Sequence, residues 1–372
     1  MGEKKAVIKV SVPFVNADIA GSPSVRIRGD HAARMRYLEA IAVEAESVAE
    51  DFGGSVIEAI AIDGPMPSVM SPDGLGAFLR SLGRFFNVRP DCESSIVAAP
   101  HTVGTPTLTG WGLGKMRRVV LRAESLQASE LQAIGAPYGP ADIQNAILFL
   151  DRFGVRNVDA MLTVGIPGQT EASLLRSVRS LAGVGVPHVT LRPFAAGNPP
   201  ADRDCMRRLF DVACERLATL GYGQWLPGRF SRSDAPGSAF AAAVAQGADV
   251  VGIGLGATTL CGGAACRTTD DFERYTAAPD NPEAIVAAAV RFDDAASRVL
   301  AMARSLMRSD AHQGGIGCCA GDEGCTPAAP PASMRGLAEF SAGAWHFTED
   351  GRFAWFNGDE PFSVAAECFS AG

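Results

Sequence analysis

Short runs of β-branched residues alternate with amphipathic stretches through the first 195 residues of the chain. Such runs occupy 6–12, 55–62, 94–99, 118–121, 157–164 and 188–194. The stretches between them carry apolar residues at helical spacing, such as Met35, Leu38 and Ile41 within 30–52. Six consecutive strand–helix units predict a parallel sheet, open or curled into a barrel. The carboxyl ends of its strands then form one rim, where ligands bind in such folds.

The alternation of strand-like and helix-like segments ends after residue 200. We expect a helix over 202–220, a glycine-rich strand over 250–257 and an alanine-rich helix over 282–308. Residues 314–333 have the glycine and proline content of a linker. Residues 344–356 contain two alternating segments joined at Asp350-Gly351, which predicts a hairpin. The expected divisions are therefore a barrel (1–200), a helical and glycine-strand region (201–313), the linker (314–333) and a small β-containing appendage (334–372).

Composition limits the classes of partner. A net charge of -8 with a pI near 5.3 argues against a nucleic-acid partner, which requires a basic face. The sequence has no apolar run as long as the roughly 18–20 residues of a transmembrane helix, and its start lacks the pattern of a signal peptide. We therefore expect a cytoplasmic protein that binds neither membrane nor nucleic acid.

Five of the nine cysteines lie between 261 and 325, namely Cys261, Cys266, Cys318, Cys319 and Cys325. In a cytoplasmic protein such a cluster suggests metal or redox chemistry before structural disulfides. A soft metal such as zinc, or an iron–sulfur centre, is one interpretation. The spacings are not those of standard structural zinc sites, so a redox-labile or inert set of cysteines is the alternative.

Five segments resemble one family in the same order. They are residues 64–82 (GPMPSVMSPDGLGAFLRSL), 118–125 (RVVLRAES), 164–170 (VGIPGQT), Gly221-Tyr222 and 247–260 (GADVVGIGLGATTL). The chain thereby resembles the oxygen-independent coproporphyrinogen III oxidases and related heme chaperones of the radical S-adenosylmethionine superfamily. That family has GGTPS for the first segment, RxSxGxQS for the second and GLPGQT for the third. The resemblance implies an incomplete (β/α)6 barrel of TIM type, followed by a helical region.

The family opens with HIPFCxxxCxYC, whose three thiolates hold a [4Fe–4S] cluster. The matching stretch here keeps Pro13-Phe14, but the thiolate positions are Val15, Ile19 and Ser22. Valine and isoleucine have no lone pair, and serine is a poor iron ligand beside a thiolate. We expect no cluster at this place.

The family's S-adenosylmethionine contacts are also replaced. The turn after strand two keeps one glycine, Gly64. The family's polar residues on strands three, four and five correspond to Val97, Glu124 and Met161, and the arginine that follows its strand-four segment corresponds to Ala136. Losing several hydrogen bonds at about 1 kcal/mol each leaves little affinity, so we expect binding weaker than about millimolar. The family's pairs linked to heme handling, His-Asn and Tyr-Trp, fall at Phe240-Ala241 and Val244-Ala245.

A remaining ligand pocket is expected at the rim of the barrel. The stretch that corresponds to the cluster loop follows strand one, so Val15 and Ile19 should border that pocket and make one side apolar. This favours a flat, apolar ligand or a partner surface over a small charged metabolite. The candidate lining residues are Val15, Ile19, Gly64, His101, Glu124, Ser125, Gly165, Gln169, Gly254 and Gly256. For the glycines, close backbone packing is the alternative explanation.

Three functions follow from these expectations. The first is a cluster-less relative of the family that binds a tetrapyrrole-like or other apolar ligand, or an active paralogue, without radical chemistry. The second is an enzyme with new chemistry on the same barrel, using the C-terminal cysteines and a metal. The third is a structural subunit, which a cavity filled by Val15, Ile19, Val97 and Met161 would favour.

Overall fold

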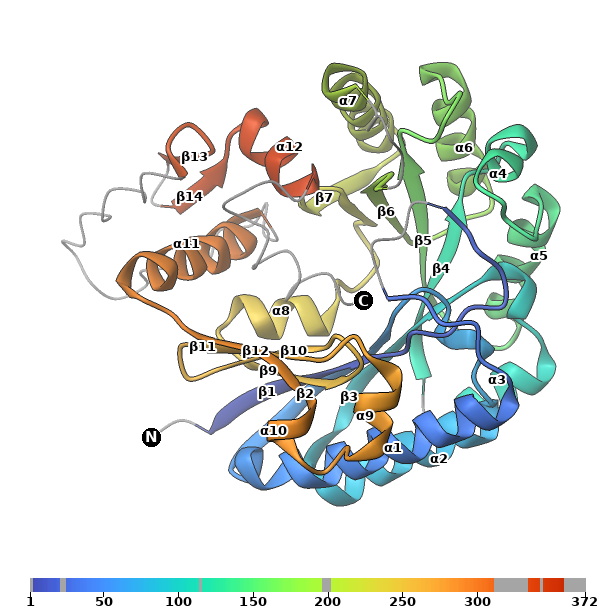
Figure 1. Cartoon of the computed structure of the whole chain (residues 1–372). Helices are drawn as coiled ribbons and strands as arrows, with labels where there is room; N and C mark the ends of the chain where they lie inside the picture. Colours follow the sequence, from blue (N-terminus) through green and yellow to red (C-terminus); the bar gives the residue numbers. More distant parts are fainter. Residues whose placement is uncertain are drawn as a thin grey trace.

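The computed structural model describes residues 3–20, 25–113, 116–195, 202–310, 334–341 and 344–357. Within them, one curved 12-stranded sheet has the order β12-β11-β10-β9-β1-β2-β3-β4-β5-β6-β8-β7 (Figure 1). Its central strands are parallel. They are β1 (Lys4–Ser11), β2 (Ser55–Asp63), β3 (Asn87–Ala98), β4 (Met116–Glu124), β5 (Asn157–Val164), β6 (His188–Pro193) and β9 (Asp249–Gly254).

Antiparallel strands extend both ends of the sheet. On the β9 side lie β10 (Thr258–Cys261), β11 (Ala264–Thr268) and β12 (Val286–Arg291), and on the β6 side lie β8 (Arg229–Arg232) and β7 (Tyr222–Leu226). Strands from both sides of residue 200 therefore share one sheet. A separate two-stranded sheet contains β13 (Ala338–Ser341) and β14 (Ala344–Phe347).

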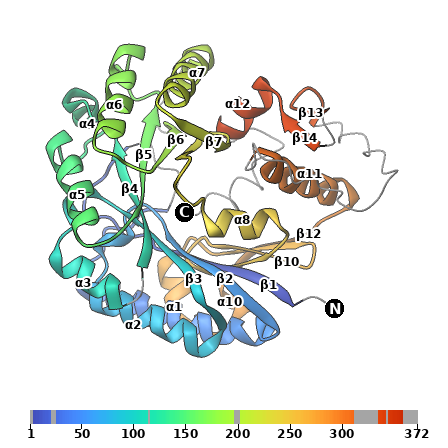
Figure 2. The same ribbon diagram turned by 180° about the vertical axis from the view of Figure 1, so that it is seen from behind.

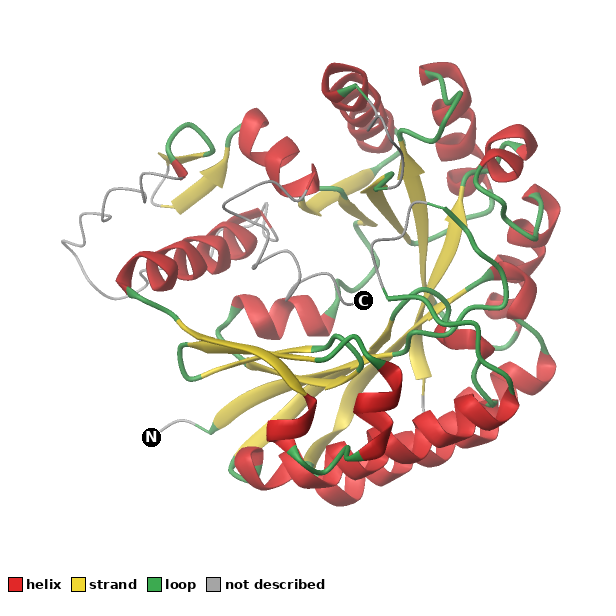
Figure 3. Ribbon diagram, viewed as in Figure 1, coloured by secondary structure: helices red, strands yellow, loops and turns green. Residues whose placement is uncertain are grey.

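Helices cover the convex side and the open side of the sheet (Figures 2 and 3). Those of the barrel are α1 (His31–Ala49), α2 (Pro72–Phe85), α3 (Thr105–Leu113), α4 (Ala128–Ala133), α5 (Pro140–Arg152), α6 (Glu171–Gly183) and α7 (Arg203–Thr219). The later helices are α8 (Ala239–Ala245), α9 (Phe272–Ala277), α10 (Pro282–Ile285), α11 (Asp294–Asp310) and α12 (Glu349–Asn357). Short 3₁₀ turns are η1 (Glu50–Phe52), η2 (Pro67–Val69) and η3 (Pro100–Thr102).

Alternate strand residues belong to two hydrophobic clusters. On β1, Ile8 and Val10 pack in the larger cluster with α1, whereas Val7 packs in the smaller cluster with α8 and α11. This period of two is what a strand produces when both of its faces are covered. Polar residues interrupt the concave side, and the candidate site is built from them.

The expected fold is confirmed, with two corrections after residue 280 and two unexpected hairpins before it. The predicted helix 282–308 is α10, β12 and α11, because Val286–Arg291 pairs with β11 despite its alanine content. The predicted hairpin at 344–356 is wrong: β14 pairs with β13, and Asp350-Gly351 lies inside α12. The hairpins β7–β8 and β10–β11 were not expected. Among the described residues, no helix is both long and apolar enough to cross a membrane.

Candidate functional site

Side chains of β4, β5 and β6 meet on the concave face at the carboxyl ends of these strands. Arg122 and Glu124 lie two residues apart at the end of β4, where the pairing with β5 is irregular, and their side chains meet. The Arg122 Nε donates to Glu124 Oε1 at 2.7 Å, and Arg192 Nη2 on β6 donates to both Glu124 oxygens at 3.0 and 3.1 Å. The Thr163 hydroxyl on β5 donates to the same carboxylate. Glu124 is 1% exposed, so this is a buried ion-pair network.

The electrostatics of the network keep Glu124 ionised. Burial alone would raise its pKa, but the two adjoining guanidinium groups and the Thr163 hydroxyl lower the pKa to about 2. Arg122 also donates to the Pro65 carbonyl at 2.5 Å and so ties β4 to the turn after β2. In the motif described above, Arg122 stands where the family has the glycine of RxSxGxQS. A long, buried side chain therefore occupies a place that is empty of side chain in the family pattern.

The β5–α6 turn joins the same region through Gln169. Its Oε1 accepts from the Gly165 N–H at 2.7 Å, and its Nε2 donates to the Thr163 carbonyl and to Glu130 Oε2. Ser125 donates to the same Glu130 oxygen at 2.6 Å. Thr163 and Glu130 thus link four candidate residues, Glu124, Ser125, Gly165 and Gln169, whose polar groups are engaged in internal hydrogen bonds.

His101 and Gly64 lie next to this group. The His101 ring stacks on Tyr138 with centroids 5.6 Å apart, and its Nε2 lies 3.2 Å from Asn16 Oδ1. The Tyr138 hydroxyl donates to the Arg122 carbonyl at 2.7 Å. Gly64 has φ +131°, and a Cβ there would lie 2.1 Å from the Val12 carbonyl oxygen. Backbone packing is therefore enough to require this glycine.

Val15 and Ile19 are buried in the loop after β1. They are 4% and 3% exposed and belong to the larger hydrophobic cluster, while Val97 and Met161 are members of neither cluster. Backbone hydrogen bonds from Val15 N to Ile27 O and from Ala20 N to Ile134 O fix the loop. The two side chains therefore present little surface to a ligand, and their place in a pocket stays a prediction. Ser22 lies outside the described residues.

Gly254 and Gly256 lie near the end of β9, beside β1 and α1. The Gly254 N–H donates to Glu44 Oε2 at 2.7 Å, and a Cβ at Gly254 would lie 2.5 Å from the Ser11 carbonyl oxygen. A Cβ at Gly256 would lie 2.5 Å from Asp270 Oδ1. The contact with backbone favours the packing explanation for Gly254, and the φ of +65° favours a backbone explanation for Gly256. These contacts do not connect the two glycines with the Glu124 network.

Cys261 and Cys266 lie on the β10–β11 hairpin. The Cys261 thiol donates to Asp249 Oδ2 at 3.3 Å, and burial raises the pKa of both thiols. Cys318, Cys319 and Cys325 lie outside the described residues. In the part that the structure does describe, His, Cys, Asp and Glu side chains do not gather in threes as a metal site would need. The metal interpretation stays a prediction.

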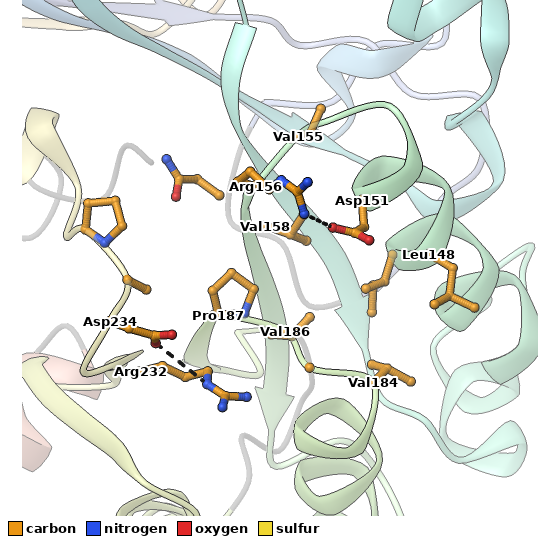
Figure 4. A pocket seen from close by; sticks show the side chains of 15 residues that line it. Leu148, Asp151, Val155, Arg156, Val158, Val184, Val186, Pro187, Arg232 and Asp234 are labelled. Carbon is orange, nitrogen blue, oxygen red and sulfur yellow. Dashed lines mark hydrogen bonds and ion pairs between the residues drawn. The ribbon is translucent and has the colours of Figure 1, made fainter.

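A hollow of about 340 Å³ lies at the opposite end of β5 and β6. Figure 4 shows apolar side chains such as Leu148, Val158 and Pro187 around it, with the Arg156–Asp151 and Arg232–Asp234 ion pairs. None of the residues singled out in the sequence lines it. In this type of fold, chemistry gathers at the carboxyl ends of the strands, so we do not assign the hollow to the candidate site.

Sequence reasoning missed the basic residues of the concave face. Arg118, Arg122 and Arg192 interrupt apolar strands at positions that face the interior. Arg118, at 1% exposure, pairs with Glu93 and donates to the carbonyls of Pro236 and Gly237. The sequence signal that could have revealed them is a charged residue at an inward-facing position of an otherwise apolar strand. A buried charge of this kind requires a partner of opposite charge inside the barrel.

Comparisons with known proteins agree with the motifs. No family model matches the chain. It is 23% identical over 186 residues to a heme chaperone HemW of Haemophilus influenzae, with 48% of this chain and 49% of that protein covered. It is 23% identical over 219 residues to the mitochondrial radical S-adenosyl methionine domain-containing protein 1 of Bos taurus, with 55% and 49% covered. The matches span about half the length of these curated relatives.

An oxygen-independent coproporphyrinogen III oxidase of Bradyrhizobium diazoefficiens is 25% identical over 144 residues, which are 38% of this chain and 32% of that protein. Among solved structures, coproporphyrinogen III oxidase (HemN) of Escherichia coli superimposes with a TM-score of 0.76 at 14% identity. That superposition covers 98% of this chain and 89% of the oxidase. The fold is therefore that of a radical S-adenosylmethionine barrel, and the chain is related in sequence to the heme chaperone and coproporphyrinogen III oxidase branch of that superfamily.

Proposed function

We propose that this chain is a ligand-binding member of its branch that has lost radical S-adenosylmethionine chemistry. The observation that carries the proposal is the network of Arg122, Glu124 and Arg192. It stands where the family pattern has a glycine and a polar contact for the sulfonium ligand. Breaking it to admit a ligand would leave buried charges without partners, which costs about 3–5 kcal/mol.

The loop after β1 supports the same conclusion. The two apolar residues at thiolate positions, Val15 and Ile19, are integrated into the core, and the loop backbone is hydrogen-bonded to neighbouring segments. Iron bound at this loop would have neither of these side chains as a ligand. Both halves of the radical chemistry, the cluster and the sulfonium compound, therefore lack their usual contacts.

The ligand that we propose is a flat, tetrapyrrole-like molecule with carboxylate groups. Two of the relatives described above are named for heme and for coproporphyrinogen. The concave face keeps partly exposed side chains: Met161 is half-buried, and the side chains of Lys9 and Arg192, which pair with Asp63 and Glu124, are still 16% and 18% exposed. An apolar thioether and partly exposed basic groups on one face suit an apolar ring that carries acids.

Binding should not depend on iron. The positions that correspond to the family's pairs linked to heme handling, Phe240-Ala241 and Val244-Ala245, are buried and apolar on α8. These side chains offer no ligand for a heme iron. We therefore expect coproporphyrin III without metal and hemin to bind with similar affinity.

Absorbance titrations with coproporphyrin III and hemin test the proposal. Met161→Trp fills the concave face and should weaken binding at least tenfold. Leu148→Trp, at a side chain that is 53% exposed on α5, is the matched control and should leave binding unchanged. Calorimetry should detect no S-adenosylmethionine binding. The proposal fails if the wild type binds neither tetrapyrrole, or if it binds S-adenosylmethionine at micromolar concentration.

A further inference from the structure

The end strand β12 exposes an apolar surface. Within the described residues it pairs only with β11, and residues 287–291 are all exposed. Val290 is 59% exposed, more than any other large apolar side chain in the described part of the chain. The strand at the other end of the sheet, β7, is held by a hydrogen bond of 2.8 Å from Arg352 on α12 to Gln224. Uncovered edges of this kind are templates for pairing with another chain.

The hydrogen bonds of β12 identify the backbone groups that face outward. Phe292 N donates to Gly263 O at 2.8 Å, and Val290 lies opposite Ala265. In an antiparallel pair, successive residues of a strand alternate between bonding to the neighbour and facing away. Ala288 and Val290 therefore bond towards β11, whereas the N–H and C=O groups of Ala289 and Arg291 face outward.

We propose that β12 is the surface through which two copies of this chain pair, antiparallel about a twofold axis at Val290. Ala289 of each copy lies opposite Arg291 of the other and exchanges two backbone hydrogen bonds with it. The two Val290 residues then form a non-hydrogen-bonded pair, in which Cα atoms are about 4.5 Å apart and side chains are closest. The most exposed apolar side chain becomes buried, and one continuous sheet runs through both copies.

The symmetry of the strand favours a second copy over an unrelated peptide. A register shift at Ala287 interrupts the ladder with β11, so the regular segment is 288–292 and is centred on Val290. A twofold interface requires one patch to be complementary to itself, and a strand centred in this way satisfies that condition. Each Arg291 faces the small Ala289 of the other copy, so the two arginines do not oppose each other.

The first test is the mass in solution, measured by light scattering over a range of concentrations. The wild type should reach twice the mass of one chain. Val290→Lys places two like charges at the axis and should give the single-chain mass with an unchanged thermal midpoint. Val43→Lys is the matched control, because Val43 is an exposed valine (40%) on α1, and this variant should still form the dimer.

The second test is a disulfide at the axis. The Cα separation of the pair fits a disulfide, so Val290→Cys should cross-link two copies under mild oxidation, and peptide mass spectrometry should map the bond to residue 290 in both. Mapping is required because the chain already has nine cysteines. A wild type that stays monomeric, a Val290→Lys dimer, or a Val290→Cys dimer linked elsewhere would each overturn the proposal. None of these outcomes depends on tetrapyrrole binding.

Discussion

Arg122 and Glu124, two residues apart on β4, form an ion pair of 2.7 Å inside the barrel. Glu124 has φ +59° and is the only residue other than glycine in the described part of the chain with a positive φ. Such a backbone conformation costs about 1–3 kcal/mol at a bulky residue and persists only where the surroundings impose it. Here the bonds from the two arginines and Thr163 to the carboxylate hold Glu124 in this conformation and offset its cost.

The first prediction is that Glu124→Gln destabilises the protein strongly. The substitution keeps the shape but leaves Arg122 and Arg192 as buried charges without their counter-ion. The free energy of unfolding, measured in urea, should fall by about 3–5 kcal/mol. The control is Asp91→Asn, which breaks an exposed ion pair with Arg89 and should cost less than about 1 kcal/mol. Equal losses for the two variants would show that the network contributes no more than a surface pair.

The pH dependence of Glu124 has a defined sign. Its folded pKa, about 2, lies below the ordinary value of 4.5. The stability that it contributes is therefore complete above pH 4.5 and is lost as the pH falls towards 2. The difference in unfolding free energy between the wild type and Glu124→Gln should shrink over this window. A constant difference from pH 5 to pH 2 would contradict the assignment.

Glu44 should act in the opposite direction. This buried residue of α1 accepts hydrogen bonds from the Tyr275 hydroxyl and the Gly254 N–H, yet burial raises its pKa from 4.5 to about 7. A raised pKa gives stability that is complete below pH 4.5 and is lost as the pH rises to 7, by roughly 3 kcal/mol in total. Urea unfolding at several pH values should show this loss in the wild type and a flatter profile in Glu44→Gln. Glu46→Gln, at an exposed glutamate of the same helix, should keep the wild-type profile.

The parallel half of the fold could be predicted from the sequence because each strand there is a continuous β-branched run between helices with recognisable caps. Asp30, Ser71 and Thr170 are the N-caps of α1, α2 and α6, and each is of a residue type that helix starts prefer. The part after residue 280 could not be predicted in this way. Residues 286–291 have an alanine content that favours a helix. They form a strand because they pair with β11, and this tertiary interaction cannot be predicted from local propensity.

The candidate site, too, could be predicted only in part from the sequence. The sequence identified Glu124, Ser125, Gly165 and Gln169 as rim residues because strand ends are recognisable, and the structure links them in one network through Glu130 and Thr163. It did not identify Glu124's partner Arg192, which comes from a strand two positions away in the sheet. Partners of this kind depend on strand order and register, so they become visible only when the sheet is assembled.

Gly254 provides a test of the packing explanation. It has φ +105°, and a Cβ would lie 2.5 Å from the Ser11 carbonyl oxygen and 2.6 Å from the Tyr37 hydroxyl. Gly254→Ala should cost about 1–2 kcal/mol for the left-handed backbone and about 1–3 kcal/mol more for overpacking. Gly154→Ala isolates the backbone cost, since Gly154 has φ +80° and no atom within 4 Å of the added Cβ. Equal thermal midpoints for the two variants would show that Gly254 has room for a side chain.

The last prediction concerns the loop that corresponds to the family's cluster site. Val15 is 4% exposed in the larger hydrophobic cluster, so Val15→Asp would bury a charge without a partner. The free energy of unfolding should fall by more than about 4 kcal/mol, in the range of the most damaging single substitutions. Val43→Asp, at the exposed valine of α1, should change it by less than about 0.5 kcal/mol. If Val15 instead lines an open pocket, Val15→Asp will keep the wild-type midpoint and lose only ligand binding. Anaerobic reconstitution with iron and sulfide completes the test: the wild type should acquire no stoichiometric cluster whose absorption vanishes on changing residues 15–22 and not on changing Cys318 or Cys319.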